Sequence, residues 1–304
     1  MRFRTLLFTT FMMLLAFDST LPAVDILYVT LRNDTIVSYD TSSGVAANIL
    51  ATKAIFASTN LDMPQDMAFD SSGNLYVANA GNNSISKFDS TGVYLSSINS
   101  DLISPRGLAF DNAGNLYASN EVNTISKFDS AGRYLSNISS NLNQPAGLAF
   151  DLSGNLHVAN AISTISKFDS AGNYVSNITS HLGLPLDLAI DSSGNLYAAN
   201  ELGDNISKFD SAGNYLSTIG SRSVLNNPYS LAFDSSGNLY ATNYGDGTIS
   251  KFDSGGNFLT NWSIGGTEPP LYLTFKPLIV PEPSTYALAT IATGVIAYLA
   301  HRRK

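Results

Sequence analysis

Short alternations of apolar and polar positions recur along this chain, separated by turns rich in Asp, Gly and Asn. In residues 108–135, LAFDNAGNLYASNEVNTISKFDSAGRYL, the runs LAF and LYA are apolar, whereas ISKF and YL are mixed. Between them stand D-x-x-G-N and D-S-x-G, in which Asp can cap its own turn and Gly can take the positive φ of a tight hairpin. The pattern predicts four short strands joined by tight turns, with no helix.

This four-stranded unit repeats at a nearly constant spacing. Aligned on one apolar position, it recurs at Phe69, Phe110, Phe150, Ile190 and Phe233, in steps of 41, 40, 40 and 43 residues. Such a period is typical of a closed or stacked array of one supersecondary unit. A four-stranded sheet with apolar residues on both faces is not stable alone, so neighbouring units must cover each other as the blades of a β-propeller do.

The two ends of the repeated region each hold part of a sixth unit. Residues 26–50 match the second, third and fourth strands but lack the first, whereas residues 270–275, PLYLTF, align with residues 228–233, PYSLAF. We therefore expect Leu271–Phe275 to pair with Ile26–Thr30 as the innermost strand of this unit. Pairing of this kind closes the ring and removes an open sheet edge. The predicted fold is an all-β, six-bladed propeller closed by its C-terminal strand.

The amino-acid sequence of the repeated unit resembles that of a known family. Over residues 62–260 the unit resembles the NHL repeat of six-bladed propellers. The resemblance rests on three consecutive motifs, P-x-G-L-A-F-D, G-N-L-Y-x-x-N and I-S-K-F-D. The chain departs from that family's frequent Asp at one position of the second strand, where it has an amide instead, at Asn79, Asn120, Asn160, Asn200 and Asn243.

The two ends of the chain resemble export and sorting signals. Residues 1–23 have two Arg, an apolar run and a small residue, the layout of a secretory signal peptide, which leaves residues 24–279 as the propeller. Residues 280–304 resemble the PEP-CTERM sorting segment of Gram-negative bacteria. Its parts are the motif Val280, Pro281, Glu282, Pro283 and Ser284, an apolar helix up to Ala300 short enough to be marginal for a bilayer, and the basic end Arg302, Arg303 and Lys304.

That resemblance implies a route for the protein. An exosortase-type enzyme would process it at the outer face of the inner membrane, after transient anchoring there, and it would end at the cell surface or outside the cell. An ordinary single-span anchor is the alternative interpretation of residues 280–304.

Charge and composition limit the classes of partner that the protein can bind. The chain has no Cys, which excludes disulfides and thiolate metal sites. Residues 24–280 hold 11 basic and 22 acidic side chains, a net charge of about −11. This acidity disfavours nucleic acid, since phosphate contacts need clustered Lys and Arg. Cations, neutral glycans or basic proteins fit better.

Candidate catalytic residues are few. His157 and His181 are the only histidines before the C-terminal segment, too few for a three-His zinc site, and His157 replaces a strand Tyr, which favours a packing role. No G-x-S-x-G motif is present. The lysine of each I-S-K-F is followed two residues later by Asp, as in Lys87 and Asp89, so we expect local charge balance there.

The positions at which the repeats differ are better candidates for a binding site. In a propeller the loops between the second and third strands share a face with the channel mouth, and here they carry Glu121, Glu201, Asp204, Tyr244 and Asp246. Near the start of the first strands, Asp66 and Asp187 stand three blades apart, hence roughly opposite each other. Two such carboxylates can hold Ca²⁺ or another hard cation.

Three classes of function follow. The first is a non-catalytic binding or display platform at the cell surface, with an exopolysaccharide or surface proteins as partners. The second is a metal-dependent enzyme similar to the lactonase propellers, or one similar to the streptogramin lyases, which use a catalytic His. The third is a sensor domain held at the membrane, which the four residues after the apolar segment, His-Arg-Arg-Lys, disfavour.

Overall fold

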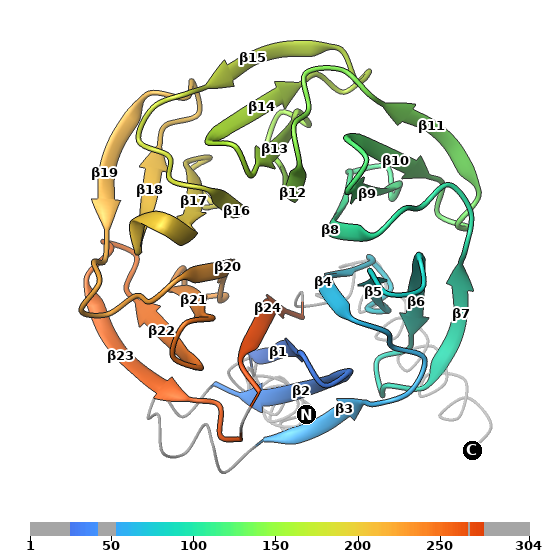
Figure 1. The fold of residues 1–304 in the computed structure, drawn as a ribbon, viewed down its shortest axis with the longest axis horizontal. Helices are drawn as coiled ribbons and strands as arrows, with labels where there is room; N and C mark the ends of the chain where they lie inside the picture. The colour runs from blue at the N-terminus through green and yellow to red at the C-terminus, as the bar shows by residue number, and fades with distance from the viewer. Residues whose placement is uncertain (1–24, 42–52, 267, 277–304) are drawn as a thin grey trace, which may run out of the picture.

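The computed structural model describes residues 25–41, 53–266 and 268–276. These form six antiparallel four-stranded sheets arranged as blades around a central axis (Figure 1). Blade 1 consists of β24 (Pro270–Phe275), β1 (Ile26–Leu31), β2 (Thr35–Asp40) and β3 (Ala54–Ala57). The six-bladed all-β architecture predicted from the repeat is confirmed.

The other five blades follow in chain order, from the innermost strand to the rim. Blade 2 is β4 (Pro64–Phe69), β5 (Leu75–Asn79), β6 (Ser84–Phe88) and β7 (Tyr94–Ile98). Blade 3 is β8 (Pro105–Phe110), β9 (Leu116–Asn120), β10 (Thr124–Phe128) and β11 (Tyr134–Ile138). Blade 4 is β12 (Pro145–Phe150), β13 (Leu156–Asn160), β14 (Thr164–Phe168) and β15 (Tyr174–Ile178). Blade 5 is β16 (Pro185–Ile190), β17 (Leu196–Asn200), the single-turn η1 (Glu201–Gly203), β18 (Asn205–Phe209) and β19 (Tyr215–Ile219). Blade 6 is β20 (Pro228–Phe233), β21 (Leu239–Asn243), β22 (Thr248–Phe252) and β23 (Phe258–Ser263).

Ring closure occurs in blade 1 as predicted. Strand β24 pairs antiparallel with β1, with Phe275 opposite Leu27 and Leu273 opposite Val29. Leu273, Leu27 and Val29 are fully or almost fully buried in one apolar cluster with residues of blade 6. The two ends of the propeller are therefore held in one sheet.

Apolar contacts between blades form the core. The Tyr of each second strand packs edge-on against the Phe that ends the innermost strand of the next blade, as in Tyr76 and Phe110, whose ring centroids are 5.1 Å apart. The same pair joins most other blades. Blade 4 has His157 in place of this Tyr, and blade 5 has Ile190 in place of this Phe. Both departures from the repeat thus fall at the same interface.

Each buried second-strand Asn anchors the loop that arrives from the preceding blade. The Oδ1 atom of Asn79 accepts a hydrogen bond from the Asp62 backbone N–H at 3.2 Å, and its Nδ2 donates to Ser86 Oγ at 2.9 Å. Ser86 in turn donates its hydroxyl hydrogen to the Asn60 carbonyl at 2.6 Å. The site requires a group that both donates and accepts. This explains the amide where the family often has Asp.

The repeated lysines are neutralised, but not by the expected partners. Lys87 Nζ lies 3.4 Å from Asp70 in the hairpin between the first two strands, rather than pairing with Asp89, and 4.8 Å from the centre of the Tyr76 ring. Asp89 instead caps its own turn by accepting hydrogen bonds from Thr91 and Val93. The same lysine-to-hairpin ion pair occurs in blades 3 to 6.

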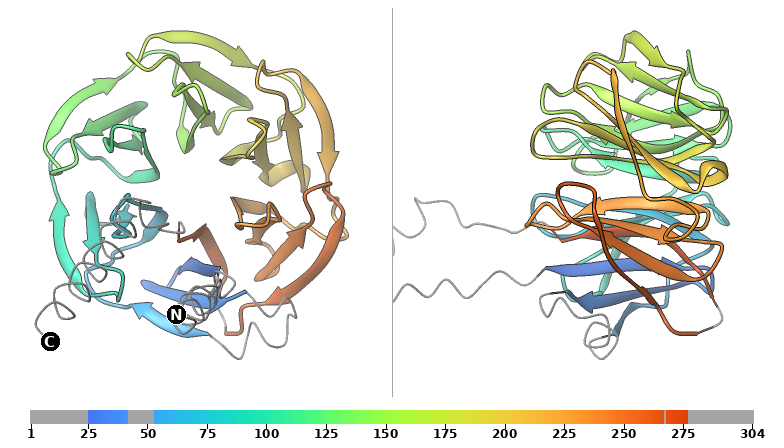
Figure 2. Two further views of the ribbon diagram at one scale, coloured as in Figure 1. Left: turned by 180° about the vertical axis from the view of Figure 1, so that it is seen from behind. Right: turned by 90° about the vertical axis from the view of Figure 1, so that its left-hand side faces the viewer.

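The propeller has two distinct faces, seen edge-on in Figure 2. One, the loop face, carries the connections between second and third strands and between blades. The other, the hairpin face, carries the turns that follow the first and third strands. Within the ranges that the structure describes, no helix is long and apolar enough to cross a membrane. The predicted signal peptide and sorting segment lie outside those ranges.

Candidate functional site

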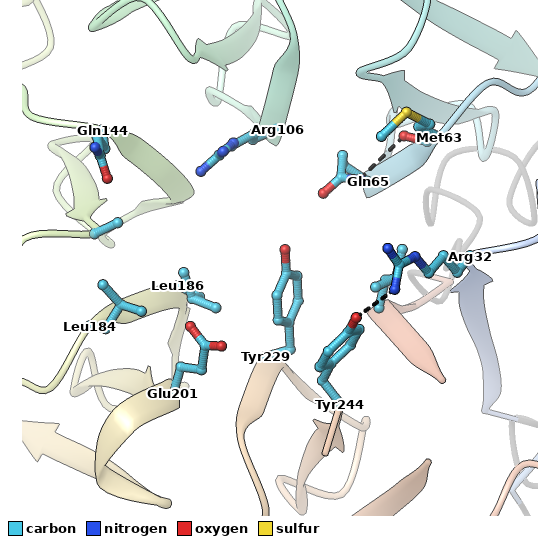
Figure 3. A pocket seen from close by; sticks show the side chains of 12 residues that line it. Arg32, Met63, Gln65, Arg106, Gln144, Leu184, Leu186, Glu201, Tyr229 and Tyr244 are labelled. Atoms are coloured by element: carbon cyan, nitrogen blue, oxygen red, sulfur yellow. Dashed lines mark hydrogen bonds between the residues drawn. The ribbon is translucent and has the colours of Figure 1, made fainter. Parts of the chain in front are cut away.

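A cavity of about 670 Å³ opens on the loop face around the central axis (Figure 3). It is lined by Arg32, Met63, Gln65, Arg106, Gln144, Ala161, Leu184, Leu186, Glu201, Tyr229, Tyr244 and Leu271. Its volume lies in the range of sites for small molecules.

Equivalent positions of the different blades build this cavity. One set is the second residue of each innermost strand, where the chain has Gln65, Arg106, Ala146, Leu186, Tyr229 and Leu271. A second set directly follows the second strand, where it has Arg32, Ala80, Glu121, Ala161, Glu201 and Tyr244. In blades 2 to 6 the residues of the second and third strands are nearly constant, whereas these two sets of positions differ from blade to blade.

Polar groups from separate blades converge in the cavity. The Arg106 guanidinium, the Gln65 amide and the Tyr229 hydroxyl point into the same central space (Figure 3). Gln65 donates its Nε2 hydrogens to the Met63 and Pro64 carbonyls at 3.2 and 3.4 Å, which leaves its Oε1 toward the cavity. Arg106 lies 3.9 Å from Glu121, a long contact between exposed side chains.

Two tyrosines from blade 6 form one wall. The Tyr229 and Tyr244 rings lie 5.8 Å apart at an angle of 35°. Arg32 Nη1 donates a hydrogen bond to the Tyr244 hydroxyl at 2.8 Å, which fixes that ring across the joint between blades 6 and 1. Burial raises the pKa of Tyr229, with a smaller opposing effect of Arg106. The Tyr229 phenol is therefore a neutral hydroxyl group at neutral pH.

Glu201 supplies a carboxylate on another side of the cavity, from the single-turn η1 (Figure 3). Partial burial raises the pKa of Glu201. The cavity thus combines one acceptor-rich side, a cationic donor and an aromatic wall, and it can bind a ligand that carries both charged and hydroxyl groups.

The five predicted loop residues do not all share this cavity. Glu201 and Tyr244 line it, and Glu121 lies beside it as the neighbour of Arg106. Asp204 does not line it, because it accepts a hydrogen bond from the Asn227 N–H at 2.9 Å and pairs with Arg222 at 3.0 Å. Asp246 also does not line it and caps its own turn at Thr248.

Asp66 and Asp187 line a different cavity, of about 210 Å³, together with Phe69 and Phe275 at the ends of innermost strands. They are 7% and 5% exposed, so the expectation that they stand at the mouth beside the variable loops is wrong. The strand register is interrupted beside each of them, between Pro64 and Met67 and between Pro185 and Asp187.

Both carboxylates join neighbouring blades. Asp66 accepts hydrogen bonds from the Met67 and Leu108 N–H groups at 2.7 and 2.8 Å. Asp187 accepts from the Leu188 and Leu231 N–H groups and from the Ser230 hydroxyl, at 2.6 to 2.9 Å. Burial raises the pKa of Asp187 to about 6, and burial followed by the nearby Asp187 charge raises the pKa of Asp66.

A metal at this pair stays a prediction. In the part of the chain that the structure describes, no group of three or more His, Cys, Asp or Glu is arranged to hold an ion. The Ca²⁺ hypothesis therefore depends on Asp66 and Asp187 alone. Calorimetry with Ca²⁺ on the wild type and on Asp66→Asn tests it, and equal heats from both proteins would remove it.

The two histidines that the structure describes lie away from the loop-face cavity. His157 is 6% exposed, with Nε2 3.2 Å from Asp151 in the hairpin of its own blade. Burial lowers the pKa of His157. His181 is stacked on Tyr215 of the outer strand, with ring centroids 3.8 Å apart.

Sequence reasoning missed four residues that shape the cavity, Arg32, Gln65, Arg106 and Tyr229. The signal was present one position before Asp66 and its equivalents, where the aligned repeats also differ. In the structure it is the second residue of the innermost strand, as in Gln65, Arg106 and Tyr229, that lines the loop-face cavity.

Comparison with known proteins agrees with this architecture. A family model described as NHL repeat matches residues 61–88. The chain contains an NHL repeat. Among curated proteins no sequence matches it significantly.

Solved structures extend the likeness to the whole propeller. A chain from a nidogen/laminin complex is similar with a TM-score of 0.72 and 18% identity, over 84% of this chain and 99% of that one. A protein of unknown function from Bacteroides caccae has a TM-score of 0.64 and 14% identity, over 84% and 99%. A streptogramin B lyase has 0.64 and 14%, over 82% and 91%. Identities this low show a shared fold.

Proposed function

We propose that this NHL-type propeller is a binding platform at the cell surface, and that its ligand occupies the loop-face cavity. The observation that carries the proposal is where the repeats differ. Structural positions are nearly constant from blade to blade, whereas the positions that line the cavity carry different side chains in different blades. Packing explains the constant positions but does not explain an Arg, a Tyr and a Gln at equivalent sites.

The ends of the chain and the likeness to a chain from a nidogen/laminin complex support the location and the type of partner. The signal-like N-terminus and the PEP-CTERM-like C-terminus favour export, processing by an exosortase-type enzyme and display outside the cell. Partners there are exopolysaccharides or other surface proteins.

A lyase-like activity is the second candidate. The fold is also similar to that of a streptogramin B lyase, and Glu201 in the cavity has a raised pKa, which suits a general acid or base. Neither His157 nor His181 lines the cavity, so a base of the His type would have to be replaced by this carboxylate.

Ligand binding to the cavity is tested with a glycan and protein array on the wild type and on Tyr229→Ala. The control is Tyr174→Ala, an exposed Tyr of the rim strand β15. We expect Tyr229→Ala alone to lose the bound ligand, by about tenfold or more for a buried aromatic contact. Ligands retained by Tyr229→Ala but lost by Tyr174→Ala would move the site to the rim.

A further inference from the structure

The cavity has an unusual charge for this molecule. Residues 24–280 are strongly acidic and contain only four Arg, of which Arg32 and Arg106 line this one cavity. Arg32 is engaged with the Tyr244 hydroxyl. Arg32 keeps its charge, but it lies at the edge of the cavity against Tyr244, whereas Arg106 points into the central space (Figure 3). Arg106 is the cation that faces the centre of the cavity.

Arg106 is only weakly engaged in the protein. Its contact with Glu121 spans 3.9 Å, and the two side chains are 35% and 60% exposed. Ion pairs this long and exposed contribute little, so a ligand can displace Glu121 at small cost. A guanidinium offers a planar fork of donors that matches a carboxylate in a two-point contact.

The groups around Arg106 are mainly acceptors. Gln65 turns its Oε1 into the cavity because its Nε2 is bonded to backbone carbonyls. Glu201 adds a carboxylate from the side of blade 5 (Figure 3). These acceptors suit a ligand that bears hydroxyl groups next to its anionic group. Inside the cavity they would repel a second negative charge, so the space beside Arg106 suits one carboxylate of the ligand.

The tyrosines give the site a flat wall. Tyr229 and Tyr244 present aromatic surface with hydroxyl groups at its edge, a surface that can cover a ring having one apolar face and a polar rim. Leu186 and Leu271 complete the apolar part of the lining.

We propose that the loop-face cavity binds a uronic acid residue of an acidic polysaccharide, with its carboxylate on Arg106, its hydroxyl groups on Gln65 and Glu201, and its ring against Tyr229 and Tyr244. This assignment rests on the proposed function, because it names the ligand class of the same cavity. A pyranose with a single carboxylate supplies all three kinds of contact at once.

The test compares a ligand that carries carboxylates with the same ligand after methyl esters have neutralised them. Binding of an oligogalacturonate and of its fully methyl-esterified form is measured by calorimetry on the full-length protein. A charge-assisted contact predicts that the ester binds about 10- to 100-fold more weakly. Equal affinity for both forms would overturn the assignment of an anionic ligand.

Variants of the protein then test whether the carboxylate of the ligand contacts Arg106. Arg106→Gln should bind the acidic oligomer and its ester with similar, weak affinity, whereas Glu121→Gln should bind the acidic oligomer at least as tightly as the wild type does. The control is Arg133→Gln, an exposed Arg of the hairpin face paired with Asp129, which should change nothing. Selectivity for the acid retained in Arg106→Gln would overturn the role of Arg106.

Failure of this inference can be distinguished from failure of the proposed function. One outcome is a neutral glycan or a protein whose binding is abolished by Tyr229→Ala but not by Arg106→Gln. That outcome would overturn the uronate assignment and leave the cavity as the binding site. Absence of any ligand that depends on Tyr229 would overturn both.

Discussion

The hydrogens of a side-chain amide decide which residue stands at the end of the second strand in blades 2 to 6. Asn120 donates Nδ2 hydrogens to Thr124 and Ser126 while its Oδ1 accepts from the Ile103 N–H. Nearby loop positions need only an acceptor, and there the chain uses either an amide or a carboxylate, as in Asn123, which accepts from Gln144, and Asp204, which accepts from Asn227. The hydrogen-bond requirement, not charge as such, therefore selects Asn.

We expect Asn120→Asp to destabilise the fold by roughly 2 to 4 kcal/mol. The buried carboxylate would face the Thr124 and Ser126 hydroxyl oxygens, and it has no hydrogen to donate to them. Asn123→Asp is the matched control and should cost less than about 0.5 kcal/mol at an exposed acceptor. Chemical unfolding followed by the fluorescence of Trp262, the single Trp, measures both. Equal losses in the two variants would contradict the donor requirement.

Asp187 makes stability depend on pH. Burial raises its pKa in the folded state from 3.8 to about 6, so between these values the folded state binds more protons than the unfolded state. The stability that this group contributes is present below pH 3.8 and is lost as pH rises through 6. We expect the wild type to lose roughly 2 to 3 kcal/mol relative to Asp187→Asn between pH 4 and 8.

The measurement is the unfolding free energy of both proteins across that range. Taking the difference between them cancels aspartates that do not interact with Asp187, such as Asp70, where burial opposes a pKa that hydrogen bonds from Asn74 and the charge of Lys87 lower. It does not cancel Asp66, because the Asp187 charge contributes to the raised pKa of Asp66 and Asp187→Asn removes that charge. A difference that stays constant with pH, or that changes in the opposite sense, would show that Asp187 does not titrate in this way.

At the scale of strands, the sequence was sufficient for the blades and insufficient for the site. Alternation, Gly turns and the 40-residue period predict each strand, because these local rules act in the same way in every repeat. The Lys87 to Asp70 pair and the cavity depend on tertiary placement. Each innermost strand begins with Pro and has an irregular register after it, as between Pro64 and Met67, and periodicity alone does not reveal which of its side chains line the cavity.

Strand β24 provides a test of closure at this scale. Leu273 is 2% exposed against Leu27 and Val29, so Leu273→Ala should destabilise the propeller by about 2 to 4 kcal/mol through lost burial and a cavity. Leu259→Ala, with the same change in the rim strand β23 at 51% exposure, should stay within about 0.5 kcal/mol. Thermal or urea unfolding compares them. A loss for Leu273→Ala no larger than that for Leu259→Ala would mean that β24 does not close the core.

At the scale of the molecule, the direction of β24 fixes where the C-terminal segment leaves. The strand begins near Leu271, which lines the loop-face cavity, and ends at Phe275, which lines the opposite cavity with Phe69. The Lys276 N–H then bonds to the Ile26 carbonyl. The chain therefore leaves on the hairpin face, and the four residues 276–279 can span at most about 14 Å before the proposed sorting segment.

If the proposed sorting segment is embedded in a membrane, a connection so short would hold the hairpin face against the bilayer and turn the loop-face cavity outward. The chain has no Cys, so single Cys residues can report this orientation. Val122, in the loop after β9, and Ala113, in the hairpin before β9, are both exposed and belong to one blade. In intact spheroplasts a bulky maleimide should label Val122→Cys several times faster than Ala113→Cys, because the membrane shields only the hairpin face, and the two rates should become similar once detergent removes the membrane. Faster labelling of Ala113→Cys in spheroplasts would show that the cavity faces the membrane, where a long polysaccharide could not reach it.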